Sequence, residues 1–429
     1  MNNNSLSRHI GLFHLTMYGV GLILGAGIYV LIGEAAEFAG NALWISFILG
    51  AIVATFAGLS YSELTALFPK AAAEYVFVKE GFRSEFIGFI IGWLTIITSI
   101  IVASTVALGF GGYMEEITGI PIIISALIVL GILSFVNFIG IKESAWANTV
   151  FAIVTVAGLG IIVFIGFTFP VEHEINYFES PLGVHGIILA FVLVFFAFIG
   201  FEDMANVAEE VKRPSRTIPK GIMLSVLIVT VIYILVSIAS IRVVEWERLA
   251  ESAAPLAFVA EQKLGQQGHF ILSIIALFAT ASTILITLVA GARIFYGMAR
   301  GGSLPKKLGV IHQKTKTPWL AVVIIFLTTL GFCFIGDIVV VANIVVFAVV
   351  VTFAMINLSV ILLRYVKPEM ERPYRVPVNI GKFPVLPLFG LGASIYMGTQ
   401  FEIEIMLYGL AIIAAGIIFY LIFNKRKTT

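Results

Sequence analysis

The chain is 429 residues long, and 60% of its residues are apolar while only 12% are charged. Because soluble domains average about 25% charged residues, this composition excludes an ordinary soluble protein and leaves room only for short polar loops. The net charge of +1 carries no information about partners, and the single cysteine, Cys333, excludes an intramolecular disulfide and a multi-cysteine metal site.

Apolar runs that are long enough to cross a bilayer, which takes about 20 residues each, follow one another along the whole chain. They predict twelve membrane spans. The first of these is too long for a signal-peptide core, so we expect it to remain in the mature protein. The expected spans lie at residues 11–33, 43–67, 86–114, 121–140, 146–169, 184–208, 220–242, 268–298, 319–336, 338–363, 384–400 and 403–423.

The placement of basic residues supports this count. If the N-terminus is cytoplasmic, all but three of the 26 Lys and Arg residues fall in cytoplasmic loops, termini or span ends. The exceptions are Arg242, Arg248 and Lys263. The sequence therefore predicts a multi-pass protein with both termini in the cytoplasm, and the plasma membrane is its default location. The largest basic cluster, at residues 306–316, is interpreted as a topology signal rather than a nucleic-acid site.

The first span contains four glycines in nine residues, Gly19, Gly21, Gly25 and Gly27. Each glycine weakens a helix by about 1 kcal/mol relative to alanine, and an unwound segment in lipid is tolerated only where it lines a cavity or is buried in protein. Unwinding around Ala26 would expose backbone N–H groups at the start of a half-helix, which form a carboxylate site without a cationic side chain. The alternative is close helix packing through small residues.

The sixth span carries an acidic pair, Glu202 and Asp203, directly after Gly200 and the aromatic run 195–201. A charge in mid-membrane costs about 2.5–3.5 kcal/mol on insertion scales, so such residues usually face a bundle interior or a water-filled path. A second break at Gly200 would free carbonyl groups to accept hydrogen bonds from an ammonium group. The alternative is a polar crevice in which the two carboxyls pair with nearby hydroxyls.

The two candidate breaks lie five spans apart. Five spans reverse the orientation of a repeat, so the pair predicts two inverted five-span repeats with a substrate site between broken helices at the membrane midplane. We expect one transporter domain over residues 1–429, with repeats at about 11–169 and 184–363 and two extra helices at about 384–423.

Several motifs along the chain resemble the amino acid–polyamine–organocation superfamily, most closely the cationic amino acid transporter branch with its bacterial and archaeal relatives. The resemblance rests on the sequences Gly25-Ala-Gly-Ile28, Tyr61-Ser-Glu-Leu64, Gly140-Ile-Lys-Glu-Ser144, Phe196-Ala-Phe-Ile-Gly-Phe201, Ala208-Glu-Glu-Val-Lys-Arg-Pro214, Arg293-Ile-Phe-Tyr-Gly-Met-Ala-Arg300 and Arg372-Pro-Tyr-Arg-Val-Pro377. It implies an all-α membrane protein with a leucine-transporter-like fold.

The resemblance also implies roles for residues at the two breaks. Amides at Gly25, Ala26 and Gly27 would hold a substrate carboxylate, and carbonyls at Phe196, Ala197 and Ile199 would hold its amine. An aromatic side chain at position 196 or 198 would gate the pocket. The full set of expected substrate-binding residues is Ile23, Gly25, Ala26, Gly27, Thr98, Phe196, Ala197, Phe198, Ile199 and Gly200.

The sequence departs from the branch where charges for coupling and specificity are usual. Thr155 stands in place of a fifth-span lysine, and Thr98 in place of a third-span glutamate. Proton coupling would then depend on Glu202 or Asp203, whose pKa values rise in a site of low dielectric constant. Sodium coupling would use oxygen ligands. The candidate ligands, beside Thr155, are the hydroxyls of Ser282 and Thr283, which alternatively bond their own helix.

A cluster of charged residues ends the sixth span on the cytoplasmic side. It is interpreted either as an inner gate that forms ion pairs with Arg293 or as an interfacial charge cluster. Its members are Glu209, Glu210, Lys212, Arg213 and Arg216.

The expected function is secondary transport or exchange of amino acids across the cell membrane by alternating access, with no cofactor beyond a coupling ion, H+ or Na+. The alternatives are a polyamine or amine carrier and a transport-incompetent amino-acid sensor on the same fold. No nucleophile elbow, paired-histidine metal motif or phosphate loop points to an enzyme. The expected partners are the substrate and the lipid bilayer, and the oligomeric state stays open.

Overall fold

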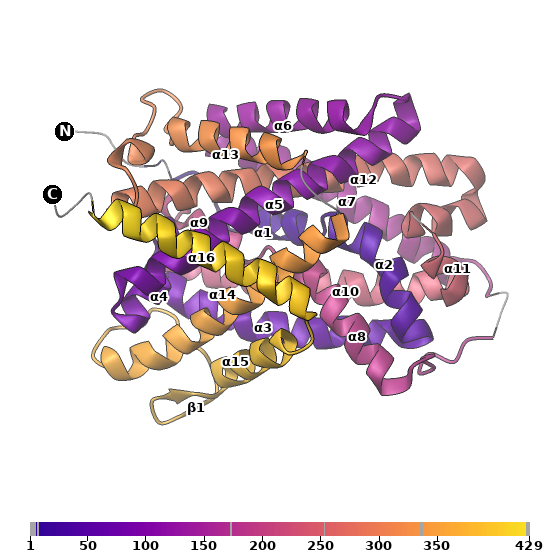
Figure 1. Ribbon diagram of the computed structural model, residues 1–429. Coiled ribbons are helices and arrows are strands. Elements are labelled where there is room, and N and C mark those ends of the chain that lie inside the picture. Colours follow the sequence, from indigo (N-terminus) through magenta and orange to yellow (C-terminus); the bar gives the residue numbers. More distant parts are fainter. Residues whose placement is uncertain (1–5, 7, 172–173, 253, 335–337, 426–429) are drawn as a thin grey trace.

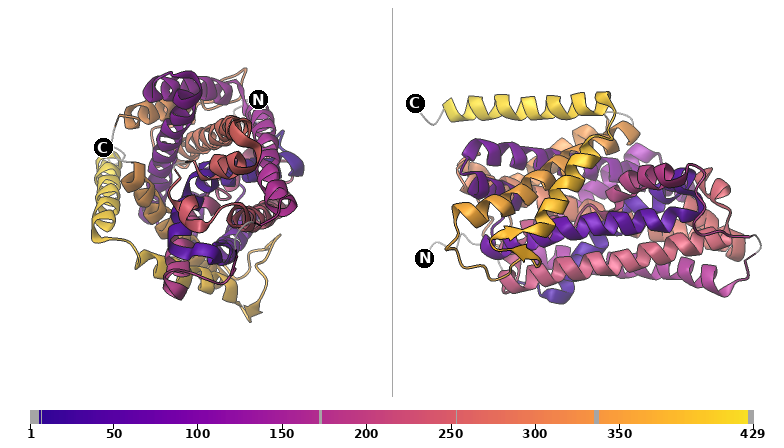
Figure 2. Two further views of the ribbon diagram at one scale, coloured as in Figure 1. Left: turned by 90° about the vertical axis from the view of Figure 1, so that its right-hand side faces the viewer. Right: turned by 90° about the horizontal axis from the view of Figure 1, so that it is seen from below.

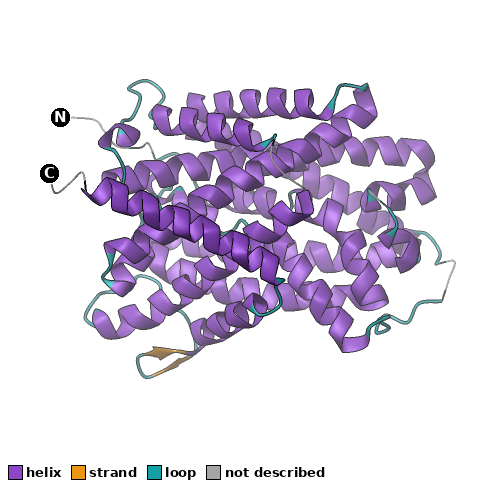
Figure 3. Cartoon of the chain, in the orientation of Figure 1, coloured by secondary structure: helices purple, strands orange, loops and turns teal. Residues whose placement is uncertain are grey.

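The computed structural model describes residues 6, 8–171, 174–252, 254–334 and 338–425. It is a bundle of helices that run mostly along one axis, and both ends of the described chain lie at the same end of the bundle (Figure 1). Figure 3 shows one small strand hairpin in the described part of the chain, which consists of β1 (Asn379–Ile380) and β2 (Phe383–Pro384).

The first half of the chain forms the helices α1 (Leu12–Ile23), α2 (Ala26–Ala39), η1 (Gly40–Ala42), α3 (Leu43–Leu67), α4 (Ala73–Phe82), α5 (Glu85–Thr118), α6 (Ile122–Ile139), α7 (Ile141–Thr168) and α8 (Gly183–Phe195). The second half forms η2 (Phe196–Phe198), α9 (Asp203–Asn206), η3 (Ala208–Glu210), α10 (Pro214–Val243), α11 (Trp246–Ala250), α12 (Pro255–Arg300), η4 (Lys306–Gly309), α13 (Trp319–Phe332), α14 (Ile338–Val366), α15 (Val385–Gly398) and α16 (Ile403–Lys425).

Within the described residues, ten helical stretches are long and apolar enough to cross a membrane. Two further expected spans correspond to the shorter apolar helices α13 and α15. The chain is therefore a helical, multi-pass membrane protein. Two short helices, α4 and α11, lie between expected spans, where the sequence predicted no membrane helix. Each packs apolar side chains against the bundle.

The core surrounds the broken spans. Helices α1, α3 and α12 bury most of their side chains, whereas only 17% of the apolar stretch of α16 is buried inside the protein. Figure 2 shows α16 in yellow along the outer edge of the bundle, with the other helices seen nearly end-on in the left view. This arrangement places both helix breaks in protein rather than in lipid, as an unwound backbone requires.

Candidate functional site

The first span is interrupted near its middle. Helix α1 ends at Ile23 and α2 begins at Ala26, so that only Leu24 and Gly25 lie outside regular helix. The amide of Gly25 donates a hydrogen bond to the carbonyl of Leu22 at 3.3 Å. The first amides of α2 have no acceptor within their own helix, because a helix leaves its N-terminal donors unpaired. A helix end rich in free donors therefore begins at residue 26, within the glycine cluster.

The sixth span is interrupted over a longer stretch. After α8 the chain forms one turn of 3-10 helix, η2, and then leaves helical geometry until α9 begins at Asp203. Gly200 has φ +130°, a backbone conformation that L side chains rarely adopt. The carbonyl of Phe196 accepts a hydrogen bond from the amide of Ile199 at 3.1 Å. The break therefore depends on glycine at position 200.

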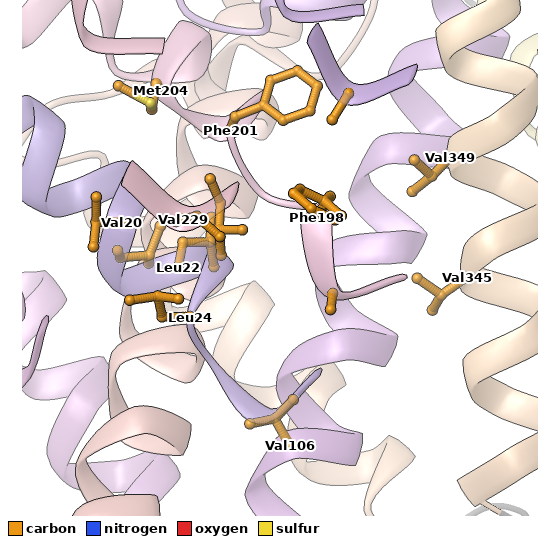
Figure 4. Close-up of a cluster of buried hydrophobic side chains, with 14 of the residues drawn as sticks. Val20, Leu22, Leu24, Val106, Phe198, Phe201, Met204, Val229, Val345 and Val349 are labelled. Carbon is orange, nitrogen blue, oxygen red and sulfur yellow. The ribbon is translucent and has the colours of Figure 1, made fainter. Parts of the chain in front are cut away.

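The two breaks lie directly against each other. A Cβ atom built on Gly27 would stand 2.8 Å from the Cα atom of Ala197, and one built on Gly200 would stand 2.6 Å from Cγ of Leu22. Figure 4 shows buried apolar side chains of this part of the core, which come from α1, both breaks, α5 and α14. Among them are Val20, Leu22, Leu24, Val106, Phe198, Phe201, Val345 and Val349.

Small-residue packing accounts for the remaining glycines of the first span. Gly19 and Gly21 lie within α1, and built Cβ atoms would stand 2.5 Å from Sδ of Met204 and 2.7 Å from Oγ of Ser282. Close packing is thus present at these two positions, and the carboxylate site stays a prediction. The first two glycines allow close helix approach, and Gly27 adjoins the sixth-span break.

Tyr233, on α10, joins the two breaks and was missed by the sequence analysis. Its hydroxyl lies 2.5 Å from the carbonyl oxygen of Ile23 and 2.8 Å from that of Ala197, so its single proton can be donated to either. The side chain is fully buried. Nothing in the sequence around this tyrosine distinguishes it from a core aromatic residue, because both acceptors are more than 30 residues away.

Replacing Tyr233 with phenylalanine should lower the free energy of unfolding by about 1–3 kcal/mol, because it removes the shared donor from two buried carbonyls. Thermal unfolding in detergent measures the change. Tyr408→Phe is the matched control, since that hydroxyl bonds Glu404 at an exposed site and should alter stability by less than about 0.5 kcal/mol. Equal unfolding temperatures for the two variants would contradict the bridging role.

A narrow cavity of about 70 Å³ lies between the breaks. A cavity needs about 10–15 Å³ to hold one water, so this cavity has room for roughly five waters or a small organic molecule. Among the described lining residues none is Lys, Arg or His. Those that the sequence analysis had singled out are Ile23, Gly27, Thr98, Phe196, Ala197, Ile199, Gly200, Glu202, Asp203 and Thr283. Gly25, Phe198, Thr155 and Ser282 are not among them.

Three carboxyl groups face this cavity. Glu202 is 7% exposed and accepts a hydrogen bond from the amide of Gly200 at 2.8 Å, and Asp203 is 9% exposed. The third, Glu74, is 1% exposed and accepts a hydrogen bond from the side-chain amide of Asn206 at 3.0 Å. Within the described residues, no group of three or more His, Cys, Asp or Glu side chains is arranged to hold a metal ion.

The sequence analysis missed Glu74. This residue falls between the expected spans at 43–67 and 86–114, whereas α4 packs against α5 and α14 and carries the carboxyl to the cavity. The available signal was the apolar setting of the glutamate, since it follows three alanines and precedes Tyr75. Ala72, with φ +57°, turns the chain immediately before α4.

The charge of Glu74, which lies outside the apolar spans, should make stability depend on pH. Burial raises the pKa of its carboxyl from 4.5 to about 7. A folded-state pKa above the unfolded value means that the folded protein binds the proton more tightly, so this contribution to stability is lost as the pH rises from about 4.5 through about 7.

The unfolding temperature of the unmodified protein should therefore fall more steeply between pH 5 and pH 8 than that of Glu74→Gln. The glutamine keeps an acceptor for Asn206 and cannot ionise. Thermal unfolding at both pH values gives the difference between the two proteins. Parallel pH profiles would show that Glu74 is not the titrating group.

The two candidate gate aromatics point in different directions. Phe196 lines the cavity. Phe198 is fully buried and packs on Phe47 and Tyr233, with ring centroids 6.5 Å and 5.2 Å away. Its ring also lies against Gly50. The 3-10 turn places these two side chains on different sides of the segment, so Phe198 does not line the cavity.

The candidate coupling hydroxyls already have protein partners. Thr155 donates to the carbonyl of Phe151 in its own helix at 2.9 Å, and Ser282 donates to Oδ1 of Asn148 at 2.6 Å. Thr283 lies on the cavity side, where its hydroxyl is 3.4 Å from the carbonyl oxygen of Leu22. Adjacent positions on α12 thus face different neighbours, and among the described residues no hydrogen bond joins Ser282 to Thr155.

The acidic end of the sixth span forms ion pairs. The guanidinium of Arg293 donates two hydrogen bonds to Glu210, each 3.0 Å long, and a third to Oδ1 of Asn137 at 2.9 Å. Arg293 and Glu210 are both inaccessible to solvent. The neighbouring Glu209 pairs with Arg300 at 3.2 Å in a more exposed position. The expected pairing with Arg293 is therefore present, through Glu210.

A second buried network joins two of the sequence motifs. Glu63 on α3 accepts hydrogen bonds from Arg364 on α14 and from the amide of Val376, at 2.5–2.8 Å. Arg372 approaches the same carboxylate at 3.3 Å. The motifs at residues 61–64 and 372–377 thus meet at one carboxylate and fasten the segment after α14 to the bundle.

Comparison with known proteins identifies the family. The family model for amino acid permeases matches residues 10–423. The branched-chain amino acid permease BcaP of Bacillus subtilis (strain 168) is 28% identical over 452 residues, covering 99% of this chain and 94% of that protein. The methylthioribose transporter of the same organism is 28% identical over 450 residues, covering 99% and 95%. The vacuolar cationic amino acid transporter 2 of Arabidopsis thaliana is 31% identical over 400 residues, covering 87% and 62%.

These matches confirm the resemblance seen in the sequence motifs. The family and the relatives are transporters, and the match extends over nearly all of the apolar helices described above. The chain therefore belongs to the amino acid permease family of the amino acid–polyamine–organocation superfamily, and it is a membrane transport protein rather than an enzyme.

Proposed function

We propose that the protein is a secondary transporter or exchanger that carries an amino acid through the cavity between the two helix breaks by alternating access. The observation that supports this most strongly is the composition of the cavity wall. It combines backbone from both breaks with three carboxyls, and its described residues include no basic side chain. A substrate carboxylate would therefore be neutralised by the N-terminus of α2, where the amides and the helix dipole favour an anion.

The proposed contacts follow from the placement of the two breaks. The amides of Ala26 and Gly27 would bind the substrate carboxylate, while the amide of Gly25 already bonds Leu22. The carbonyls of Phe196, Ala197 and Ile199 would accept hydrogen bonds from the substrate ammonium group. A carbonyl oxygen has two lone pairs, so the existing partners of the first two leave an acceptor site on each. Ile23 and Gly200 would complete this backbone cradle, and Phe196 would cover it.

The substrate side chain would lie against the apolar part of the wall. Thr98 is a polar neighbour there, and the apolar lining consists of Val102, Val106, Val349 and Phe353. We propose a neutral aliphatic amino acid as the preferred substrate, in line with the relative named a branched-chain amino acid permease. A cationic amino acid is the second candidate, because Glu74, Glu202 and Asp203 face the same space.

A ligand-binding screen on the purified protein tests this proposal. Leucine, lysine, putrescine and methylthioribose would be added separately, with and without sodium, and the unfolding temperature measured. A ligand stabilises by mass action, so a saturating concentration of about 100 times Kd adds about 2.7 kcal/mol. Stabilisation by leucine alone supports a site for neutral amino acids, and stabilisation by lysine supports a site for cationic ones. Stabilisation by putrescine alone would favour the amine carrier and remove the carboxylate site.

We further propose proton coupling through Glu202 and Asp203. Sodium coupling through Ser282 and Thr283, with Thr155, is the alternative. The proton is favoured because both carboxyls line the cavity, whereas Ser282 and Thr155 have protein hydrogen-bond partners and do not line it. A sensor that binds without transport stays a further alternative, and substrate flux distinguishes it.

Glu202→Gln should abolish substrate accumulation driven by an inward proton gradient while leaving exchange of labelled for unlabelled substrate. Glutamine can still accept the hydrogen bond from Gly200 but cannot carry a proton across. Accumulation and exchange are measured in the same proteoliposomes, with the exposed Glu404→Gln as control. Unchanged accumulation by the Glu202 variant would exclude this residue as the coupling group.

The topology that we propose has twelve spans in one domain, with inverted repeats at about 11–169 and 184–363 followed by two extra helices at about 384–423. Each expected span overlaps at least one apolar helix, which supports the count. We propose a plasma-membrane location with both termini in the cytoplasm, because the basic residues gather in loops on that side.

A further inference from the structure

A hollow of about 610 Å³ lies beside the N-terminal ends of α1 and α7 and the C-terminal end of α6, apart from the substrate cavity. Its polar side carries His9, Lys142 and Lys212, and its apolar side carries Ile139 and Trp146. A smaller adjoining hollow shares some of these residues and adds Lys314 and Lys316. The two form one groove, which we call the basic groove.

Several backbone and side-chain contacts hold the basic groove in shape. The amide of Lys212 donates to the carbonyl of Ile10 at 2.9 Å, which fixes the segment before α1 against the segment after η3. The hydroxyl of Thr317 donates to the carbonyl of Phe138 at 3.0 Å, which brings the loop before α13 to the end of α6. Gly140, with φ +152°, forms the tight turn from α6 into α7.

The charges of the basic groove are unbalanced. Four lysines line it, and Glu143 is its only acidic residue among those described. Over the described part of the chain, no carboxylate lies within 4.0 Å of the ammonium groups of Lys142, Lys212 or Lys314. The groove therefore presents net positive charge to whatever lies in it.

The apolar side of the groove continues onto the surface that faces lipid. Ile139 ends one apolar span and is 38% exposed, and Trp146, in the first turns of the next, is 65% exposed. Phe135, one turn before Ile139, is 62% exposed. Span ends lie at the level of the lipid headgroups, where tryptophan is enriched. The lysines thus lie at headgroup depth, directly beside an uncovered acyl-chain surface.

We propose that the basic groove binds an anionic phospholipid of the surrounding leaflet, with its phosphate and headgroup among the lysines and an acyl chain along Ile139 and Trp146. Basic pockets between spans on the cytoplasmic side recognise such headgroups. A topology signal would account for the lysines alone, since it needs neither a hollow nor an apolar wall. A soluble phosphate would use the charges but not the apolar wall.

The test reconstitutes the full chain in nanodiscs of phosphatidylcholine that contain a minor fraction of brominated phosphatidylglycerol or brominated phosphatidylcholine. Bromine quenches a nearby tryptophan, and the signal of Trp146 is the difference between the unmodified protein and Trp146→Phe. We expect stronger quenching of Trp146 by the anionic lipid. The triple variant Lys142→Gln, Lys212→Gln, Lys314→Gln should lower this preference at least about fivefold. Loss of even one lysine near an anionic membrane surface has an effect of about this size.

The matched control is Lys306→Gln, Lys307→Gln, which removes two exposed lysines of η4 that do not line the groove. It should keep the preference for the anionic lipid. An equal loss in both variants would show general surface attraction and overturn the site, and so would an unchanged preference in the triple variant. Inorganic phosphate at millimolar concentration should not displace the lipid, and displacement would assign the groove to a soluble anion.

Discussion

Replacing Gly27 with alanine is expected to impair both substrate binding and transport. The new Cβ atom would stand 2.8 Å from Cα and 2.9 Å from Cβ of Ala197, so the backbones of the two breaks would have to separate. Overpacking of this kind costs about 1–3 kcal/mol, which corresponds to about a five- to 150-fold change in an equilibrium constant. Uptake of labelled substrate and its apparent affinity measure the loss.

Gly112→Ala provides the control for an added methyl group in a helix, because nothing lies within 4 Å of a Cβ built there. That variant should transport normally. A monodisperse elution profile and a cooperative unfolding transition would show that Gly27→Ala is folded. A folded Gly27→Ala protein with unimpaired affinity would contradict the proposal that the two breaks form the substrate site.

Replacing Arg293 with alanine is expected to destabilise the protein by about 3–5 kcal/mol, because it leaves the carboxylate of Glu210 buried and unpaired. The pair is bidentate and inaccessible to solvent. Thermal unfolding in detergent measures this loss. Glu209→Gln, which removes the charge from the more exposed pair with Arg300 and can still accept the hydrogen bond from the amide of Ala71, should cost at most about 1 kcal/mol.

A double replacement separates the two interpretations of this ion pair. Arg293→Met combined with Glu210→Leu removes both charges, and such an exchange is often neutral or stabilising. Asn137 keeps its hydrogen bond to the carbonyl of Leu288 at 3.1 Å. If the pair is a gate that must open and close, the stable double variant should transport with altered rates from the two sides. Normal transport would assign the pair to packing alone.

The sequence predicted the membrane helices well because a helix that crosses a bilayer needs about 20 mostly apolar residues. The expected span at 43–67 coincides with α3, and the expected span at 121–140 differs from α6 by one residue at each end. Apolar length decides these boundaries. The expected eighth span at 268–298 lies within the part of α12 that follows Gly265, where the backbone leaves helical geometry. The part of α12 before Gly265 was missed, because it is too short to cross a membrane.

The sequence predicted the candidate site only where glycines mark an irregular backbone. The glycines located both breaks, since a glycine in a span marks either close approach or an irregular backbone. Side chains that reach the site from distant elements left no such mark. Tyr233 and Glu74 come from α10 and α4, and their partners at the breaks are set by tertiary packing. Phe196 and Phe198 were equivalent in the sequence, and only the 3-10 turn separates them.

The most direct test of the proposed transport function is flux through the purified protein in liposomes. Vesicles loaded with unlabelled leucine or lysine would be placed in labelled substrate, with proton and sodium gradients imposed separately, and Gly27→Ala vesicles as the matched control. Accumulation of labelled amino acid by the unmodified protein, enhanced by an inward proton gradient and reduced by the variant, is the predicted result. Absence of flux for any of the twenty amino acids under every gradient, from protein that binds one of them, would contradict transport and favour a sensor.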